Sequence, residues 1–82
     1  MQLRTRVGLN IQELRREKGW SQEALAHAAG IDRGYMGKIE NGKYAASLDM
    51  IEKVAGALDV DPMDLFRSRS SYIEQAGFTG GL

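Results

Sequence analysis

The sequence contains no cysteine, a single proline and no long apolar run. Without cysteine the chain can form neither a disulfide nor a thiolate metal site, which fits a reducing cytoplasm. No stretch approaches the roughly 18 apolar residues that a membrane-spanning helix needs, and the N-terminal segment lacks the apolar run of a signal peptide. We therefore expect a cytoplasmic protein without a membrane partner.

Catalytic and metal-binding patterns are also missing. His27 stands alone without a paired ligand, no glycine-rich phosphate loop follows a strand pattern, and no nucleophile–base pair is visible. The acidic residues Asp59, Asp61 and Asp64 could suggest a metal cluster, but a helix cap followed by a first-turn acid explains them better. We expect no metal, no cofactor and no enzymatic activity.

The net charge is zero, which by itself argues against a nucleic-acid partner. The charges are nevertheless uneven along the chain. Residues 1–44 contain eight basic and five acidic residues, a balance of +3, whereas residues 45–82 contain three basic and six acidic residues, a balance of −3. Since a local patch decides where phosphates dock, the N-terminal half can still bind DNA.

Apolar residues recur at helical spacing through most of the chain. Val7, Ile11 and Leu14 mark one helical face, and the run from Leu48 to Leu58 marks another. Serine or aspartate precedes several of these segments, as is typical of helix N-caps. The pattern predicts an all-α, compact five-helix domain, with helices over 5–18, 22–29, 33–41 and 48–58 and a fifth opening at Asp61-Pro62.

The segment Ser21–Gly42 carries the clearest functional pattern. It consists of two short helices joined by a turn at Gly30, and the second of them has Arg33 and Lys38 on its polar side. This is the plan of a helix-turn-helix, which inserts one helix into the DNA major groove. Gly34 and Gly37 cost that helix about 1 kcal/mol each relative to alanine, which suggests a close approach to another surface.

The composition changes near residue 68. We expect a DNA-binding and dimerisation domain over residues 1–67 and a polar C-terminal tail over 68–82. In the tail, Tyr72, Ile73 and Ala76 are compatible with a short amphipathic helix, and disorder is equally compatible with its glycines and serines.

Several motifs together resemble one family. They are Gln22-Glu23-Ala24-Leu25-Ala26, Gly30-Ile31-Asp32, Ile39-Glu40-Asn41-Gly42-Lys43, Ser47-Leu48, and Ile51 through Leu58-Asp59-Val60. Their order and spacing are similar to those of the Cro/CI-like (XRE-type) helix-turn-helix regulators of phages and bacteria. The stretch from Asp32 to Glu40, with its Asp-Arg-Gly-Tyr start, most resembles the controller proteins of restriction–modification systems.

The resemblance implies roles for matching positions. Residues at Gln22, Asn41 and Lys43 would contact DNA phosphates, and Arg15 and Glu40 would form an ion pair between the first and third helices. Residues at five positions would face base edges, namely Arg33, Gly34, Tyr35, Gly37 and Lys38. Many family members carry polar side chains where this chain has Gly34 and Gly37, so side-chain base reading must rest on the other three.

Physical chemistry supports some of these roles directly. The planar fork of Arg33 can bond both O6 and N7 of guanine, although an exposed arginine that contacts only solvent fits the spacing equally. Tyr35 can pack on a thymine methyl or bond a phosphate, and the alternative is a half-buried packing residue. Lys38 lies about 140° around the helix from Arg33, which favours the DNA backbone over the bases. Gln22 lies at a helix N-terminus, which attracts anions.

One recognition helix covers only a few base pairs, so we expect a homodimer on a pseudo-palindromic operator. The apolar residues of the fifth helix, Val60, Met63, Leu65 and Phe66, are the expected dimer interface unless all four are internal. The expected function is a transcription regulator of double-stranded DNA, a repressor or an activator that touches RNA polymerase. The alternative is an antitoxin-type module whose tail binds a protein.

Overall fold

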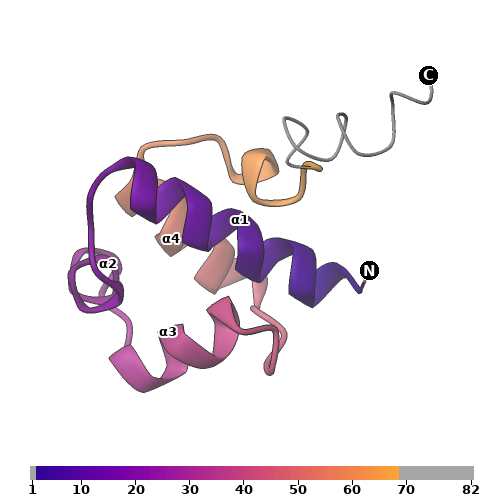
Figure 1. Ribbon diagram of the computed structural model, residues 1–82, viewed down its shortest axis with the longest axis horizontal. Coiled ribbons are helices and arrows are strands. Elements are labelled where there is room, and N and C mark those ends of the chain that lie inside the picture. The colour runs from indigo at the N-terminus through magenta and orange to yellow at the C-terminus, as the bar shows by residue number, and fades with distance from the viewer. Residues whose placement is uncertain (1, 69–82) are drawn as a thin grey trace.

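The computed structural model describes residues 2–68, which form four α-helices and one short 3-10 helix (Figure 1). The α-helices are α1 (Leu3–Glu17), α2 (Gln22–Ala29), α3 (Arg33–Glu40) and α4 (Leu48–Leu58), and the 3-10 helix η1 covers Pro62–Leu65. No strand occurs in this part of the chain. In Figure 1, α1 lies between α3 on one side and η1 on the other, and it contacts both. The all-helical prediction is confirmed.

The first helix differs slightly from its predicted bounds. It begins two residues earlier than expected, because the Gln2 carbonyl accepts hydrogen bonds from the N–H groups of Thr5 and Arg6 at 3.1 Å each. It ends at Glu17 with Lys18 as its cap, and Gly19 then adopts a left-handed conformation with φ 74°. Only glycine reaches this conformation without steric cost, so Gly19 stops the helix and turns the chain toward α2.

The next three helices begin at the side chains that the sequence indicates. Ser21, Asp32 and Ser47 each accept a hydrogen bond from the backbone N–H three residues later, at 3.0, 3.0 and 3.1 Å. Each such cap stabilises its helix by about 0.5–2 kcal/mol, because it satisfies one of the unpaired N–H groups at the helix start. The starts of α2, α3 and α4 are therefore fixed locally.

The predicted fifth helix is a 3-10 helix of four residues rather than an α-helix. Asp61 and Pro62 open it as expected, and the Asp61 side chain accepts a hydrogen bond from the Met63 N–H at 2.8 Å. Its hydrogen bonds join residues three apart, since the Asp64 N–H donates to the Asp61 carbonyl at 2.8 Å and the Phe66 N–H donates to the Met63 carbonyl at 2.9 Å. The buried Asn10 amide donates to the Leu65 carbonyl at 2.8 Å and ties the end of η1 to α1.

The core fills the space between the four α-helices and η1. Its fully buried side chains include Ile11 from α1, Leu25 from α2, Met36 from α3, Leu58 from α4 and Leu65 from η1. Trp20 and Ile31, in the two connections around α2, are half-buried and pack against this core. Every helical element thus contributes to one core, which fixes the position of α3 on the rest of the domain.

Gly8 marks the closest approach between α1 and α3. A Cβ atom at this position would lie 2.6 Å from the carbonyl oxygens of both Ile39 and Glu40. Such a contact with backbone atoms is too short for any side chain, so glycine is required here for packing. The sequence pattern suggests a close approach at Gly34 and Gly37 and does not mark Gly8.

The described residues contain no helix long and apolar enough to cross a membrane. Residues 69–82, which make up all but the first residue of the tail predicted over 68–82 and contain Tyr72, Ile73 and Ala76, lie outside the described part of the chain.

Candidate nucleic-acid interface

α2 and α3 are joined by a three-residue turn. Gly30 adopts a left-handed conformation with φ 70°, and the Ile31 N–H donates to the Ala26 carbonyl at 2.8 Å. Asp32 then caps α3, so α3 begins directly after the hydrogen-bonded turn that ends α2. This arrangement is the helix-turn-helix that the sequence predicts.

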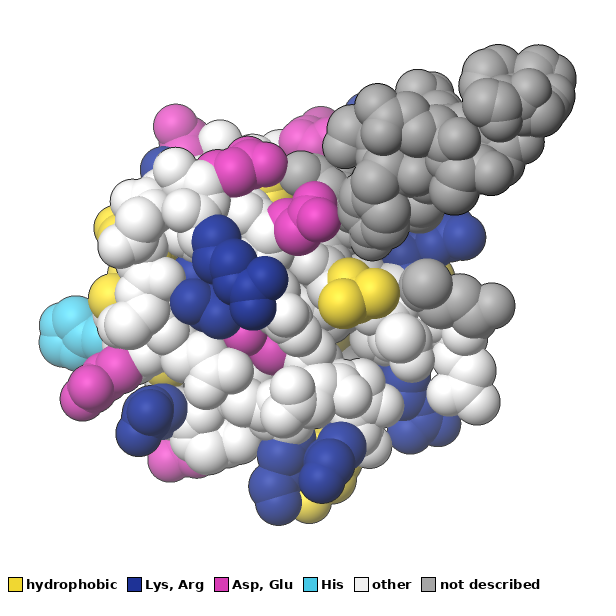
Figure 2. All heavy atoms as spheres, in the orientation of Figure 1, with side chains coloured by type: hydrophobic (Ala, Val, Ile, Leu, Met, Phe, Trp, Pro, Cys, Tyr) yellow, Lys and Arg dark blue, Asp and Glu magenta, His cyan; other side chains and the backbone are white. Residues whose placement is uncertain are grey.

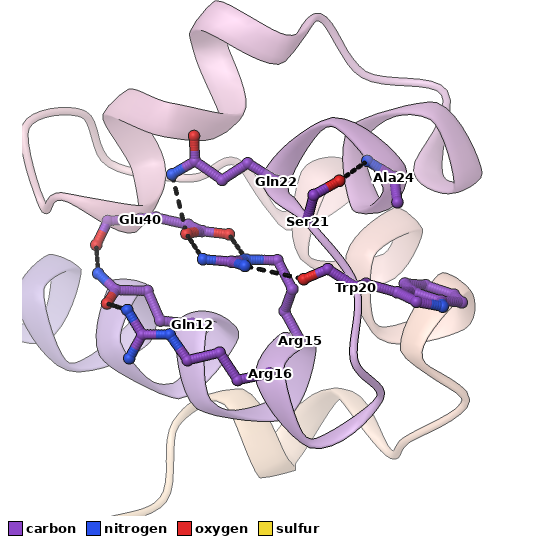
Figure 3. Close-up of polar contacts among 8 residues, drawn as sticks. All are labelled: Gln12, Arg15, Arg16, Trp20, Ser21, Gln22, Ala24 and Glu40. Atoms are coloured by element: carbon purple, nitrogen blue, oxygen red, sulfur yellow. Dashed lines mark hydrogen bonds and ion pairs between the residues drawn. The ribbon is translucent and has the colours of Figure 1, made fainter.

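A buried ion pair holds α3 against α1 (Figure 3). Arg15 Nε lies 2.9 Å from Glu40 Oε2 and Arg15 Nη2 lies 3.1 Å from Glu40 Oε1, so the pair is bidentate. The Glu40 side chain is fully buried, and that of Arg15 is 12% exposed. The structure therefore brings together the two residues that the family resemblance pairs. Removal of either partner would leave a buried charge without compensation.

Gln22 joins this ion pair from α2. Its Nε2 donates to Glu40 Oε1 at 3.0 Å, so the Glu40 carboxylate connects the first, second and third helices. Figure 3 shows the Gln22 oxygen pointing away from the carboxylate. Since a carboxylate only accepts hydrogen bonds, the amide has one orientation, and one N–H remains free for a further acceptor. Gln22 thus has a second, internal partner beside the phosphate that the resemblance implies.

Two further contacts of this cluster were missed in the sequence analysis. Gln12 Nε2 donates to the Glu40 backbone carbonyl at 2.7 Å, and Arg15 Nη1 donates to the Trp20 carbonyl at 2.9 Å. The first bond fastens the end of α3, and the second fastens the connection between α1 and α2 (Figure 3). Side chains that bond backbone carbonyls leave no periodic pattern in the sequence, so spacing alone does not identify them.

The outer face of α3 is open. Arg33, Gly34 and Lys38 are exposed, and Tyr35 and Gly37 are half-buried. A Cβ atom at Gly34 would lie 3.1 Å from the Asp32 carboxylate, and one at Gly37 would lie 3.4 Å from the Gln22 oxygen. Packing inside the domain therefore does not demand glycine at position 37, where an added methyl makes only an ordinary contact. The low side-chain bulk of this face leaves room for another molecule.

Basic residues line the same side of the molecule. Figure 2 shows Lys and Arg side chains along the lower edge of the view, where Figure 1 places α3 and the loop after it. Asn41 and Lys43 follow α3 directly and are exposed, as phosphate contacts must be. Arg4, which lies outside the predicted site, reaches this loop from α1, and its Nη1 donates to the Lys43 carbonyl at 3.4 Å.

The predicted dimer residues differ in exposure. Met63 is 60% exposed, and Val60 and Phe66 are half-buried. Leu65 is fully buried in the core, so its assignment to an interface was wrong, because it has no exposed surface to offer a partner. Phe66 also lines an open hollow of about 510 Å³ together with apolar residues that include Leu3 and Leu48, whose side chains are 58% and 78% exposed.

The acidic residues near η1 have structural roles. Asp59 ends α4 in a left-handed conformation, Asp61 caps η1, and Asp64 pairs with Arg67 at 2.7 Å. Across residues 2–68, no three histidine, cysteine or acidic side chains come close enough together to hold a metal ion.

The fold and the exposed α3 define a helix-turn-helix domain. The profile of the helix-turn-helix family matches residues 11–65, which is more than half of the chain. The chain belongs to the XRE-type helix-turn-helix family of DNA-binding transcription regulators.

Individual relatives agree with this assignment. The chain is 41% identical over 64 residues to the control protein C.BamHI of Bacillus amyloliquefaciens, a match that covers 77% of this chain and 79% of the relative. It is 43% identical over 58 residues to a hypothetical transcription factor of Neisseria meningitidis serogroup B, covering 71% of this chain. That match spans only 55% of the longer Neisseria protein.

Solved structures give the same result. The restriction-modification controller protein C.AhdI from Aeromonas hydrophila superposes with a TM-score of 0.75 at 46% identity, covering 77% of this chain and 96% of C.AhdI. A hypothetical transcription factor from Neisseria, NHTF, superposes with a TM-score of 0.82 at 35% identity, covering 90% of this chain and 85% of the other. These relatives are regulators rather than enzymes.

Proposed function

We propose that this protein is a sequence-specific transcription regulator that binds a pseudo-palindromic operator as a homodimer. The observation that carries the proposal is the exposed start of α3, where Arg33 projects from a helix whose other end is anchored by a buried ion pair. Arginine at the start of a recognition helix is the residue type best suited to read guanine, because its fork bonds O6 and N7 together.

Base reading and phosphate binding divide between different residues in this proposal. Arg33 and Tyr35 face base edges, and the two glycines let the backbone of α3 approach the major groove closely. Asn41 and Lys43 contact phosphates beyond the end of α3, and the free N–H of Gln22 contacts a phosphate at the start of α2, where the helix dipole also favours an anion. Lys38 completes the surface at the far side of α3.

The homodimer follows from the length of DNA that one α3 can read. Two copies related by a two-fold axis would place their recognition helices in successive major grooves about 34–36 Å apart. Met63, Val60 and Phe66 supply apolar surface for this contact, and the hollow beside Leu3 and Leu48 extends it. A two-fold interface is self-complementary, so one apolar patch serves both subunits.

The regulatory setting is drawn from the relatives. Because C.BamHI and C.AhdI are controller proteins, we place this chain in the same role, as an autoregulatory controller of a restriction–modification system. The position of the operator would then decide whether the dimer blocks RNA polymerase or touches and recruits it.

Selection of bound fragments from a random DNA pool tests the proposal. The expected result is one enriched motif with two inverted half-sites separated by about one helical turn, 10–10.5 base pairs from centre to centre. Recovery of unrelated fragments without a common motif would contradict sequence-specific binding, and a single unrepeated half-site would contradict the dimer.

A further inference from the structure

The loop after α3 brings a residue onto the DNA-facing side that the helix-turn-helix pattern does not include. Gly42 takes a left-handed conformation with φ 73°, and the N–H groups of Lys43 and Tyr44 both point to the Lys38 carbonyl, at 2.9 and 3.4 Å. The chain therefore folds back on the last turn of α3 and carries Tyr44 to its outer surface.

This loop is held on both sides. The Lys43 carbonyl accepts from Arg4 of α1 at 3.4 Å, and a Cβ at Gly42 would lie 3.3 Å from the Thr5 Cα. The loop backbone thus packs directly on the start of α1. The backbone that carries Tyr44 is therefore held in place before any ligand binds.

Tyr44 contacts two residues of α3 with one ring. Its centroid lies 5.9 Å from that of Tyr35, with the rings tilted by 51°, a spacing at which aromatic pairs attract. The Lys38 ammonium lies over the ring of Tyr44, with Nζ 5.2 Å from the ring centroid, within the range of a cation–π interaction. Tyr44 remains 48% exposed while it makes both contacts.

These contacts restrict the two α3 side chains differently. Lys38 has a long flexible stem, and the ring of Tyr44 draws its ammonium toward the loop that carries Lys43. Tyr35 is half-buried, and the Tyr44 ring limits its rotation on the open face of α3. Base reading depends on side chains that are held in place before contact.

We infer that Tyr44 is a positioning residue of the DNA-binding surface, which directs Lys38 to the phosphate backbone and holds Tyr35 in its reading position. The inference rests on the proposed function, and it assigns Lys38 to phosphate rather than to a base edge. It divides α3 into a first half that reads bases, with Arg33 and Tyr35, and a second half that contacts DNA phosphates, with Lys38.

The first test needs no DNA. Tyr44→Leu removes the aromatic face but keeps apolar bulk, and Tyr44→Phe is the matched control that keeps the ring. In the free full-length protein, the NMR signals of the Lys38 side-chain CH₂ next to the ammonium should be shifted upfield by the ring. The shift should persist in Tyr44→Phe and disappear in Tyr44→Leu. An identical Lys38 signal in all three proteins would overturn the inference, whatever the protein binds.

The second test is a double-mutant cycle on the duplex enriched from the random pool. Tyr44→Leu should weaken binding about two- to five-fold, the strength expected of an exposed cation–π contact and its ring partner, and Tyr44→Phe should not. In a Lys38→Ala background the Tyr44→Leu loss should shrink, because both changes remove one shared interaction. Fully additive losses would show that Tyr44 acts independently of Lys38 and would overturn the positioning role, while DNA binding itself would stand.

Discussion

The Arg15 guanidinium and the Glu40 carboxylate meet at two points inside the domain, with N–O distances of 2.9 and 3.1 Å. Glu40 is the last residue of α3, and its side chain has no exposed surface. A charge of this kind is tolerated only because Arg15 and Gln22 both donate to it. The recognition helix is therefore fixed at its end, while its start remains open.

Removal of the Arg15 side chain should lower the stability of the domain. Arg15→Ala leaves the buried carboxylate unpaired and should lower the free energy of unfolding by about 3–5 kcal/mol. The neighbouring Arg16→Ala is the control, since the exposed Arg16 donates to Gln12 at 3.2 Å on the surface and its loss should change stability by about 0.5 kcal/mol or less. Urea unfolding followed by circular dichroism measures both. Equal losses would mean that the ion pair does not hold α3.

Two helix-interior glycines should respond to alanine in opposite directions. Gly8→Ala places a methyl 2.6 Å from two carbonyl oxygens and should destabilise the domain by about 1–3 kcal/mol. Gly56 is exposed in α4 with no atom within 4 Å of an added Cβ, so Gly56→Ala should stabilise by about 0.5–1 kcal/mol through helix propensity. Thermal unfolding separates the two. Stabilisation by both changes would disprove the close contact of α1 with α3.

The substitution Gly37→Ala should weaken DNA binding without lowering the stability of the domain. Gly37→Ala makes only an ordinary contact with Gln22 and improves helix propensity, so the domain should be as stable as the wild type or up to about 1 kcal/mol more stable. Binding to the selected operator should nevertheless weaken, because the methyl lies on the face that approaches DNA. Unfolding and fluorescence-anisotropy titrations measure the two effects. Unchanged affinity would show that Gly37 lies away from the DNA.

The dimer should depend on Met63. Sedimentation equilibrium should give twice the mass of the 9.1 kDa chain for the wild type on or off DNA. Met63→Glu places a charge in the proposed apolar contact and should shift the equilibrium to the monomer. His27→Glu, on the exposed side of α2, should leave the dimer intact. A strict monomer for the wild type, even with operator present, would refute the dimer.

Local chemistry in the sequence determines much of the fold. The caps Ser21, Asp32 and Ser47 define three helix starts before any packing is considered, and the helical spacing of Ile11 and Leu58 identifies core positions. Contacts between residues that lie far apart in the sequence were not predictable in this way. Gly8 is required by backbone atoms of α3, more than thirty residues away, and no periodicity marks such a contact.

The candidate site was likewise predicted only in part from the sequence. The pairing of Arg15 with Glu40 came from the family resemblance, and the structure agrees with it. Tyr44 was not selected, since it lies in a loop and its role depends on ring contacts with α3. Leu65 was grouped with Val60, Met63 and Phe66 as interface residues because all four are apolar, but apolar character alone does not separate a core residue from an interface residue, and Leu65 is fully buried.

The central claim, that α3 reads DNA through Arg33, is tested most directly by Arg33→Ala measured beside Lys43→Ala, because each variant removes one exposed positive charge. Binding of both should be measured over a range of salt concentrations on the selected operator and on an unrelated duplex. Lys43→Ala should weaken binding to both duplexes alike and lower the salt slope by about one unit. Arg33→Ala should lose about 1–3 kcal/mol of discrimination between the operator and the unrelated duplex. Equal losses on the two duplexes for Arg33→Ala would contradict the base-reading role of α3.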